Sequence, residues 1–173
     1  MTLTMEYSDY KLGIDSKLLQ LESCDENREI ATYMAQQASQ TIDVISRLLD
    51  PPIFNSPDFI EAVKKLVTKS RKARVRIIVF DPVTIVRNGH RLVDLAGSLS
   101  SFIEIKNASH QYQHYSECLM IVDETAFLHR LNWDRYEATA NFYDRRQSKY
   151  YQKEFEPMWE TSLTDPNLRR ISL

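Results

Sequence analysis

The fold prediction starts from Ser116-Glu-Cys118-Leu-Met-Ile-Val-Asp123, an apolar stretch with polar residues at both ends. Such a stretch is typical of a central strand that is covered on both faces of a sheet. The segment from Ala126 to Leu131 follows closely and is expected to run antiparallel to it. Asn132-Trp-Asp134 comes directly afterwards. We therefore expect a sheet with the first of these strands at its centre.

Strands and helices alternate along the rest of the chain. Apolar and β-branched residues predict strands at 17–22, 41–49, 74–81, 102–106 and 138–142. Helix-start signals predict helices from near residues 24, 57, 90 and 144, and Pro157 is expected to kink the last helix. This order predicts an α/β fold, a mixed central sheet flanked by helices on both faces. Residues 1–15 are polar and aperiodic, so a flexible N-terminal arm is expected before a single domain at 16–173.

Composition places the chain among globular proteins of one domain. Its 173 residues suffice for a packed core, and 43% hydrophobic with 27% charged residues argues against disordered and membrane classes. A net charge of -2 gives no overall attraction to nucleic acid or anionic lipid, so such recognition needs a local patch. No stretch has the character of a membrane span or secretory signal. A cytoplasmic location without membrane contact is therefore expected.

No metal ion and no cofactor follows from the sequence. The two cysteines, Cys24 and Cys118, do not have the spacing of metal ligands. Cys118 lies in the apolar stretch, where a small buried thiol is the simplest interpretation. The acidic residues are too dispersed to predict a metal site.

The order of elements, together with residues 116–132, resembles one half of a phospholipase D-like protein. That family carries the motif His-x-Lys-x4-Asp, followed a short distance later by Gly-Ser-x-Asn. Asp123 matches this motif, and Asn132 matches with a one-residue gap. Ser116 stands at the histidine position and Cys118 at the lysine position. The resemblance covers roughly residues 24–163, including a packing pair in the final helix, Phe155 and Trp159.

The chain resembles an uncharacterised proteobacterial domain family more closely. Members of that family occur alone or attached behind an acetyltransferase-like domain. They share the Asp-Arg-Tyr-Glu segment that lies at residues 134–137 here. This second resemblance carries a fold and no established function.

The departures from the motif favour a non-enzymatic binding or regulatory module. Phospholipase D-like enzymes use one histidine as nucleophile and another as general acid, while lysines and asparagines hold the phosphoryl oxygens. Ser116 has no adjacent base, and Cys118 offers no positive charge. The fold would keep a cleft for an anion or phosphate, with these candidate residues: Asp123, Arg130, Asn132, Arg135 and Tyr136. The simpler interpretations are a structural role for Asp123 and an arginine–glutamate ion pair.

A relocated histidine is the first alternative. His114 stands two residues before Ser116, so it would point to the same face of a strand. It would lie roughly 6–7 Å from the motif position. A chain with one motif must pair with a second copy, so this alternative is a metal-independent phosphodiesterase or nuclease that works as a homodimer. The missing half also predicts a homodimer or a partner domain for the non-catalytic module.

A basic run is the second alternative. It comprises Lys64, Lys65, Lys69, Arg71, Lys72, Arg74 and Arg76. A solvated helix end is the simplest interpretation, since cations suit a helix C-terminus. Nucleic-acid binding through Lys65, Lys69 and Lys72 is the functional one, and it would depend strongly on salt. Possible ligands are therefore nucleic acid or a phosphate-containing molecule.

Overall fold

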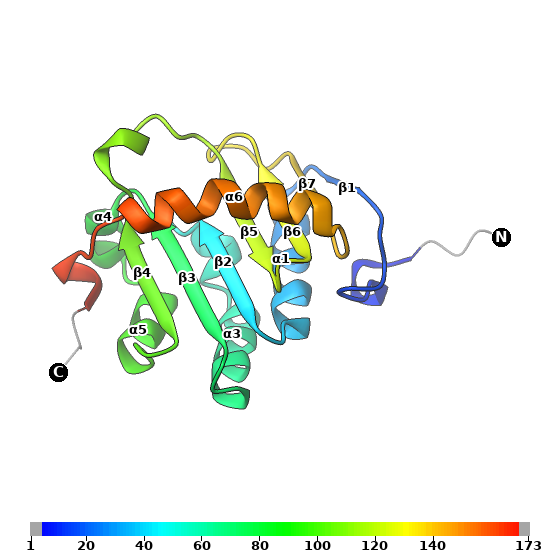
Figure 1. Ribbon diagram of the computed structural model, residues 1–173, viewed down its shortest axis with the longest axis horizontal. Helices are drawn as coiled ribbons and strands as arrows, with labels where there is room; N and C mark the ends of the chain where they lie inside the picture. The colour runs from blue at the N-terminus through cyan, green and yellow to red at the C-terminus, as the bar shows by residue number, and fades with distance from the viewer. Residues whose placement is uncertain (1–4, 170–173) are drawn as a thin grey trace.

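Seven strands form one mixed sheet in the computed structural model, which describes residues 5–169 (Figure 1). They are β1 (Leu19–Leu21), β2 (Thr41–Ile45), β3 (Arg74–Val79), β4 (Ile103–Asn107), β5 (Cys118–Val122), β6 (Ala126–Arg130) and β7 (Ala138–Asn141). The order across the sheet is β1-β7-β6-β5-β2-β3-β4. β2, β3 and β4 run parallel, and the pairs from β2–β5 to β1–β7 are antiparallel. The predicted central strand, β5, lies in the middle of this order.

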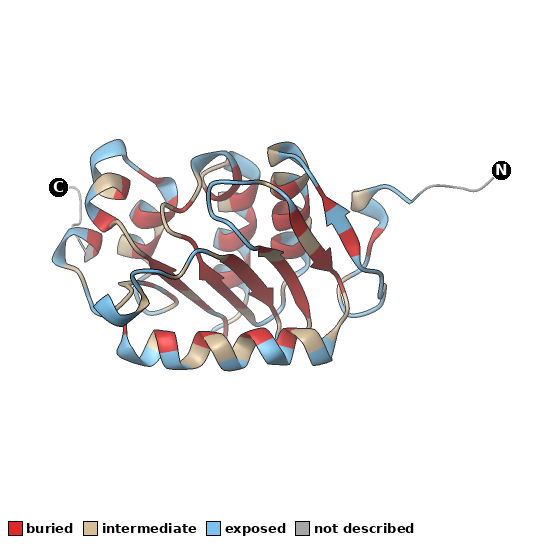
Figure 2. Ribbon diagram, turned by 90° about the horizontal axis from the view of Figure 1, so that it is seen from above, coloured by how far each residue is buried: buried red, intermediate tan, exposed pale blue. Residues whose placement is uncertain are grey.

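Helices cover both faces of the sheet, which confirms the predicted α/β class. α6 (Arg145–Thr161) crosses one face, and α1 (Cys24–Gln37), α3 (Pro57–Lys69) and α5 (Arg91–Ser98) lie on the other (Figures 1 and 2). Two shorter helices, α2 (Pro51–Phe54) and α4 (Pro82–Asn88), follow the ends of β2 and β3. Single 3-10 turns occur at Tyr7–Asp9, His110–Tyr112 and Pro166–Arg169. In residues 5–169, no helix has the length and apolarity needed to cross a membrane.

Local sequence signals explain where the long helices begin. The hydroxyl of Ser23 accepts from the N–H of Glu26 at 3.1 Å, and the Glu26 carboxylate accepts from the N–H of Ser23 at 3.2 Å. This capping box starts α1. At the start of α3 the Ser56 hydroxyl accepts from the N–H of Phe59 at 3.4 Å, and a proline occupies the first helical position. One face of α3 is then buried, formed by Phe59, Ala62, Val63, Leu66 and Val67.

The sheet separates two apolar cores of unequal size. The larger core lies between the sheet and α1, α3 and α5. The smaller core lies under α6 and comprises Ile45, Ile78, Leu119, Ile121, Phe127, Tyr151, Phe155 and Met158. Neighbouring residues of β5 thus serve opposite cores, because side chains alternate along a strand.

Two expected strands are shorter in the structure than the sequence suggested. β2 ends at Ile45, and Leu49 has a positive φ of 50° just before the two prolines that open α2. β3 ends at Val79, because Asp81 caps α4, accepting from the N–H of Thr84 at 3.2 Å. The expected kink at Pro157 does not interrupt α6, which continues as one helix to Thr161.

The segment before β1 contacts the domain. The ring of Tyr10 is 3% exposed and stacks on Phe142 with 5.6 Å between centroids. The N–H of Gly13 donates to the carbonyl of Phe142 at 2.9 Å. Part of the expected flexible arm, residues 1–4, lies outside the described residues.

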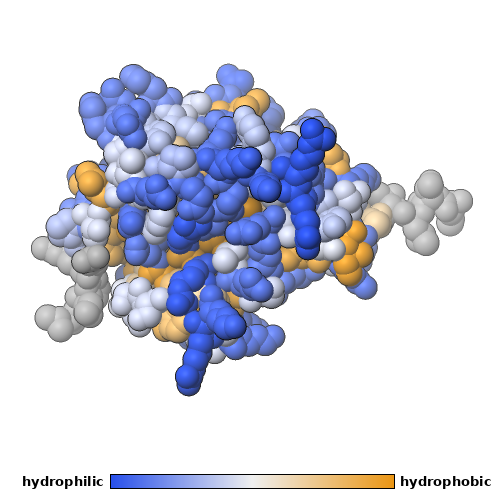
Figure 3. Space-filling model, viewed as in Figure 1, coloured by the Kyte–Doolittle hydropathy of each residue, from blue (hydrophilic) through white to orange (hydrophobic). Residues whose placement is uncertain are grey.

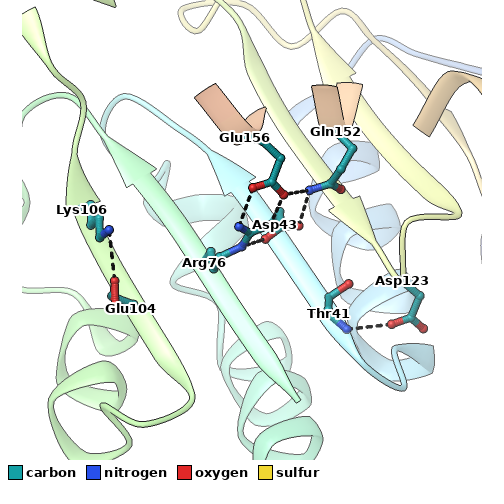
Figure 4. Close-up of polar contacts among 8 residues, drawn as sticks. All are labelled: Thr41, Asp43, Arg76, Glu104, Lys106, Asp123, Gln152 and Glu156. Carbon is teal, nitrogen blue, oxygen red and sulfur yellow. Dashed lines mark hydrogen bonds and ion pairs between the residues drawn. The ribbon is translucent and has the colours of Figure 1, made fainter. Parts of the chain in front are cut away.

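Asp123 joins the end of β5 to the connection between α1 and β2. Its carboxylate accepts from three backbone N–H groups at 2.8–2.9 Å, those of Ser39, Gln40 and Thr41 (the Thr41 contact is drawn in Figure 4). The hydroxyl of Ser39 donates to it at 3.1 Å. Asp123 also has a positive φ of 52°, a conformation that aspartate tolerates better than most residues. The structure therefore gives this motif aspartate a structural role.

Replacing Asp123 by Ala should lower the free energy of unfolding by about 2–3 kcal/mol, because several N–H groups lose a charged acceptor. Urea unfolding of the purified protein measures this loss. Glu124 provides the control, since its φ of 55° is close to that of Asp123 and its side chain is exposed. Glu124→Ala should cost less than about 0.5 kcal/mol. Equal losses in the two variants would contradict the capping role.

Candidate functional site

The histidine and lysine positions of the phospholipase D-like motif, Ser116 and Cys118, lie at one end of the sheet, which we call the motif edge. It consists of Ser46, Arg47, Phe80 and residues 115–118, where β2 and β3 end and β5 begins. Ser116 is exposed, and its hydroxyl donates to the carbonyl of Leu131 at 3.3 Å. Cys118 is the first residue of β5 and is 4% exposed. Burial raises the pKa of the Cys118 thiol to about 11, so it is uncharged at neutral pH.

The positive charge beside Cys118 belongs to Arg130. These two residues are partners in the β5–β6 register, and Arg130 is 2% exposed. Its guanidinium forms an ion pair with Asp50 and lies 4.9 Å from the ring centroid of Tyr136. The Asp50 carboxylate thus neutralises the charge nearest to the position of the family's lysine.

Arg130 also holds the loop that follows β6. Its Nε donates to the carbonyl of Arg135 at 2.7 Å, and its Nη2 donates to the carbonyl of Trp133 at 2.5 Å. With the Asp50 contact of Nη1, each of the three guanidinium nitrogens has a partner inside the protein. Arg130 is therefore a structural residue, and the expected arginine–glutamate pair is an arginine–aspartate pair instead.

A stack of aromatic rings and one arginine fills the rest of the motif edge. The guanidinium carbon of Arg47 lies 4.8 Å from the ring centroid of Phe80 and 5.4 Å from that of Trp133. Its Nη2 donates to the carbonyl of Tyr115 at 2.7 Å, and the rings of Phe80 and Tyr115 are stacked. Cation–π contacts of this kind stabilise a guanidinium between rings. The side chains of Arg47, Phe80 and Trp133 therefore pack together at the motif edge.

The structure does not bring the five anion-binding candidates together. Asp123 lies at the opposite end of β5 from Ser116, where it caps the α1–β2 connection. The other four belong to β6 and its following loop, where Asn132 and Arg135 are exposed and Tyr136 is half-buried. Burial raises the pKa of the Tyr136 hydroxyl. The length of β5 lies between Asp123 and the other four residues, so the structure does not place all five around one cleft.

His114 does not share a strand face with Ser116, which corrects the geometric expectation for a relocated histidine. β5 begins only at Cys118, and His114 is an exposed residue of the preceding loop. Its Nε2 lies 3.3 Å from the side-chain nitrogen of Gln113. Under α6, His129 contacts Glu117 at 2.6 Å.

The basic run divides into exposed lysines, which we call its surface part, and arginines that form hydrogen bonds within the protein. Lys65, Lys69 and Lys72 are exposed, and none of them forms an ion pair within residues 5–169. Arg74 instead donates to the carbonyls of Arg71 and Ala73 at 3.0 and 2.7 Å. The surface part therefore remains available for a polyanion.

Arg76 belongs to a charged network between the sheet and α6 that sequence reasoning missed (Figure 4). Its Nε and Nη2 donate to the carboxylate of Asp43 at 2.8 and 3.2 Å. Its Nη1 and Nη2 donate to the Glu156 carboxylate at 3.0 and 2.7 Å. Gln152 donates to Asp43 and Glu156 at 3.0 and 2.9 Å. The available signal was Asp43 itself, an acidic residue within an apolar strand, which needs a buried partner.

Burial and pairing act against each other in this network. Burial raises the pKa of the Asp43 carboxyl, and hydrogen bonds from Arg76 oppose that rise. Burial alone would lower the pKa of Arg76, but hydrogen bonds to Glu156 and Asp43 outweigh it and raise the pKa. The two-point contact between Arg76 and Asp43 is the geometry of a charged pair. We therefore assign Asp43 as a carboxylate that depends on Arg76.

Replacing Arg76 by Ala should lower the free energy of unfolding by about 3 kcal/mol, because Asp43, whose side chain is 3% exposed, loses its cation. Urea unfolding checks this value. The control is Glu104→Ala, which removes the partner of Lys106 at 3.5 Å; the Glu104 side chain is 49% exposed, against 3% for Asp43. The control should cost less than about 1 kcal/mol.

The loss in Arg76→Ala should also depend on pH. Without Arg76, burial raises the pKa of the Asp43 carboxyl in the folded variant above its value in the unfolded chain. The variant therefore loses stability as pH rises from the unfolded pKa of Asp43 through its folded pKa. The unfolded value for aspartate is about 3.9, so the loss should be smaller near pH 4 than near pH 7. Equal losses at both pH values would contradict the assignment of Asp43 as the uncompensated charge.

Comparison with solved structures shows a phospholipase D-like fold. The archaeal chromatin protein TrmBL2, described with a novel mode of DNA binding, is 14% identical with a TM-score of 0.61 over 88% of this chain and 55% of its own. This chain thus spans about half the length of TrmBL2. Nuc from Salmonella typhimurium, a phospholipase D family member, is 16% identical with a TM-score of 0.58 over 86% and 97% of the two chains. NucT from Helicobacter pylori is 14% identical with a TM-score of 0.59 over 86% and 99%.

Comparison with curated proteins gives no match. One family model, described as a domain of unknown function (DUF7931), matches residues 23–171. That range includes every strand after β1 and the six α-helices that the structure describes in residues 5–169. The chain belongs to the DUF7931 family, a domain of unknown function with a phospholipase D-like fold.

Proposed function

We propose that this chain is a non-catalytic binding module built on the phospholipase D-like fold. The single observation that supports this proposal most strongly is the state of Arg130. It is the cation beside the lysine position, it is 2% exposed, and its nitrogens are occupied by Asp50 and two carbonyls. Phosphoryl transfer needs preorganised donors aimed at the developing negative charge. Arg130 points its donors at the protein instead.

The histidine position supports the same proposal. A serine acts as nucleophile when an adjacent base removes its proton. The hydroxyl of Ser116 contacts the carbonyl of Leu131, which cannot act as such a base. Cys118, two residues later, is buried and uncharged. Neither residue supplies the chemistry of the side chain that it replaces.

A hydrolysis assay tests the proposal. The purified protein is incubated in EDTA with bis-p-nitrophenyl phosphate and, separately, with single-stranded DNA. We expect no turnover above that of the His114→Ala variant. His110→Ala serves as the matched control, because His110 is an exposed histidine of the same loop region. Turnover that disappears in His114→Ala and persists in His110→Ala would overturn the proposal and establish a relocated catalytic histidine.

Nucleic-acid binding is a second candidate, supported by the surface part of the basic run. Lys65, Lys69 and Lys72 are exposed, without ion pairs among residues 5–169. Their charges would contact phosphates and carry little sequence information. The fold-level likeness to a chromatin protein and to phospholipase D-like proteins agrees with this candidate but does not assign it.

Charge reversal tests this candidate. If the three lysines contact phosphates, changing Lys65, Lys69 and Lys72 to Glu should abolish duplex binding, measured by fluorescence anisotropy. The plot of log affinity against log salt for the unmodified protein should have a slope of about -3, or steeper if further cations take part. The control changes the same amount of charge at other exposed sites, with Lys11, Lys17 and Arg87 changed to Glu. If both variants bind the duplex equally weakly, the loss of affinity reflects net charge alone, and Lys65, Lys69 and Lys72 are not the binding surface.

A further inference from the structure

The strand β4 is the last in the sheet order, so within residues 5–169 one of its edges has no neighbouring strand. A cavity of about 380 Å³ lies along this edge, at the left of the sheet in Figure 1. In Figure 3, apolar surface is visible below α6, where β3 and β4 begin, and hydrophilic side chains border it. The cavity volume lies within the range of ligand sites, about 300–1,000 Å³. The residues that line the cavity include Ala96, Gly97, Ile103, Glu104, Ile105 and Leu168.

The register with β3 decides which backbone groups of β4 face the cavity. Val75 is the partner of Ile103 in this parallel pair, and the N–H of Val75 donates to the carbonyl of Phe102 at 2.8 Å. Neighbouring residues of a strand point their backbone groups to opposite sides, so the hydrogen bonds to β3 use the even-numbered residues of β4. The odd-numbered residues point their N–H and carbonyl groups away from β3: Ile103, Ile105 and Asn107.

Ile105 keeps both of its backbone groups unpaired at this edge. Asn107 exchanges two hydrogen bonds with the backbone of Leu163, at 2.8 and 2.7 Å, and the N–H of Ile103 donates to the carbonyl of Leu99 at 3.0 Å. The N–H and the carbonyl of Ile105, and the carbonyl of Ile103, have no hydrogen-bond partner among residues 5–169. Ile105 is only 6% exposed, and buried backbone groups are nearly always paired. A bound segment that supplies one donor and one acceptor would satisfy Ile105.

The bridge at Leu163 shows what kind of segment fits this edge. An extended backbone antiparallel to β4 pairs with Asn107 there. The chain then turns away, and the N–H of Leu168 donates to the carbonyl of Asp165 at 3.1 Å. The next position along the edge, opposite Ile105, is therefore open to an extended segment from another molecule. A residue at that position would direct its side chain to the α5 side of the sheet, where Ile105 belongs to the larger core.

The charge at the edge selects the next residue of such a segment. Glu104 points to the other face of the sheet than Ile105, and its side chain is 49% exposed. Lys106 lies 3.5 Å from Glu104, and its Nζ is 4.3 Å from the ring centroid of Trp159. A cation directly opposite Glu104 would form a cross-strand pair of opposite charges. The edge therefore favours an apolar residue opposite Ile105 and a basic residue opposite Glu104.

We propose that the free edge of β4 binds an extended segment of a partner protein with the order apolar, basic, apolar. The segment adds a short antiparallel strand to the sheet. Its first apolar residue exchanges two hydrogen bonds with Ile105, its basic residue lies opposite Glu104, and its second apolar residue donates to the carbonyl of Ile103. This inference goes beyond the proposed function and does not rest on it, since no residue of the motif edge takes part. Turnover in the hydrolysis assay would therefore leave it standing.

Fluorescence anisotropy with the full chain tests the proposal. The probe is an acetylated peptide, Val-Lys-Val, with a fluorophore at its C-terminus, and we expect a Kd on the order of 100 μM. A methyl group on the nitrogen of the first valine removes the donor to the Ile105 carbonyl, so this peptide should bind about tenfold more weakly. Val-Glu-Val places a second carboxylate opposite Glu104 and should bind about fivefold more weakly.

A variant of α5 blocks the cavity from the protein side. A Cβ at Gly97 would meet no atom within 4 Å, so the side chain of Gly97→Leu has room to enter the cavity. Leucine is a better helix former than glycine, so this variant should fold. It should weaken Val-Lys-Val binding about tenfold or more. The matched control is Ser98→Leu, at the exposed next position of α5, and it should leave the Kd unchanged.

A reversal of preference provides the last readout. Glu104→Lys should bind Val-Glu-Val more tightly than Val-Lys-Val. Equal binding of the methylated and unmethylated peptides would overturn the proposal, as would equal losses in Gly97→Leu and Ser98→Leu. No change in anisotropy up to about 1 mM protein would also overturn it. If the peptide does not bind and the chain instead forms dimers that Gly97→Leu dissociates, the edge pairs with a second copy and the proposal fails.

Discussion

The antiparallel pairing of β5 with β2 is the constraint on which the rest of the structure depends. The register Ile45↔Leu119 places Cys118 next to the end of β2, and the register Ile42↔Val122 brings Asp123 to its start. The first residue of β5, Cys118, therefore lies beside Arg130, which forms an ion pair with Asp50. The other end meets the three backbone N–H groups of the α1–β2 connection. Because the strand spans only Cys118–Val122, residues that are close in sequence serve opposite ends of the sheet.

The succession of strands and long helices along the chain was predictable because its signals are local. A continuous apolar run, a capping box and a Ser-Pro helix start each depend on a few neighbouring residues. The short helices α2 and α4 were not predicted, because four and seven residues do not show a helical period. Asp81-Pro82 was the available signal for α4, with a cap followed by proline at the first position.

The candidate site was less predictable, because its charges are decided by partners far away in the chain. Arg130 was predicted as an anion-binding residue, but in the structure it forms an ion pair with Asp50, which lies 80 residues earlier in the chain. Arg76 belongs to a basic run in the sequence, but in the structure it bonds to Asp43 and Glu156. These two residues lie 33 and 80 positions away from it in the chain. Sequence spacing cannot distinguish a free cation from a paired one over such distances. The exposed lysines of α3 were identified correctly as a surface group, because amphipathic spacing reports exposure directly.

Within residues 5–169, α6 is the one helix on its face of the sheet, and this has a consequence for synthesis on the ribosome. Within residues 5–169, α6 is the element that covers Ile45, Ile78, Leu119, Ile121 and Phe127. Every strand is complete by Asn141, before the first residue of α6 has been added. A nascent chain can therefore pair its sheet while one apolar face still lies open, and exposed apolar surface of this kind promotes aggregation. The seventeen residues of α6 cover this face, so the face is protected from water only after they have been synthesised.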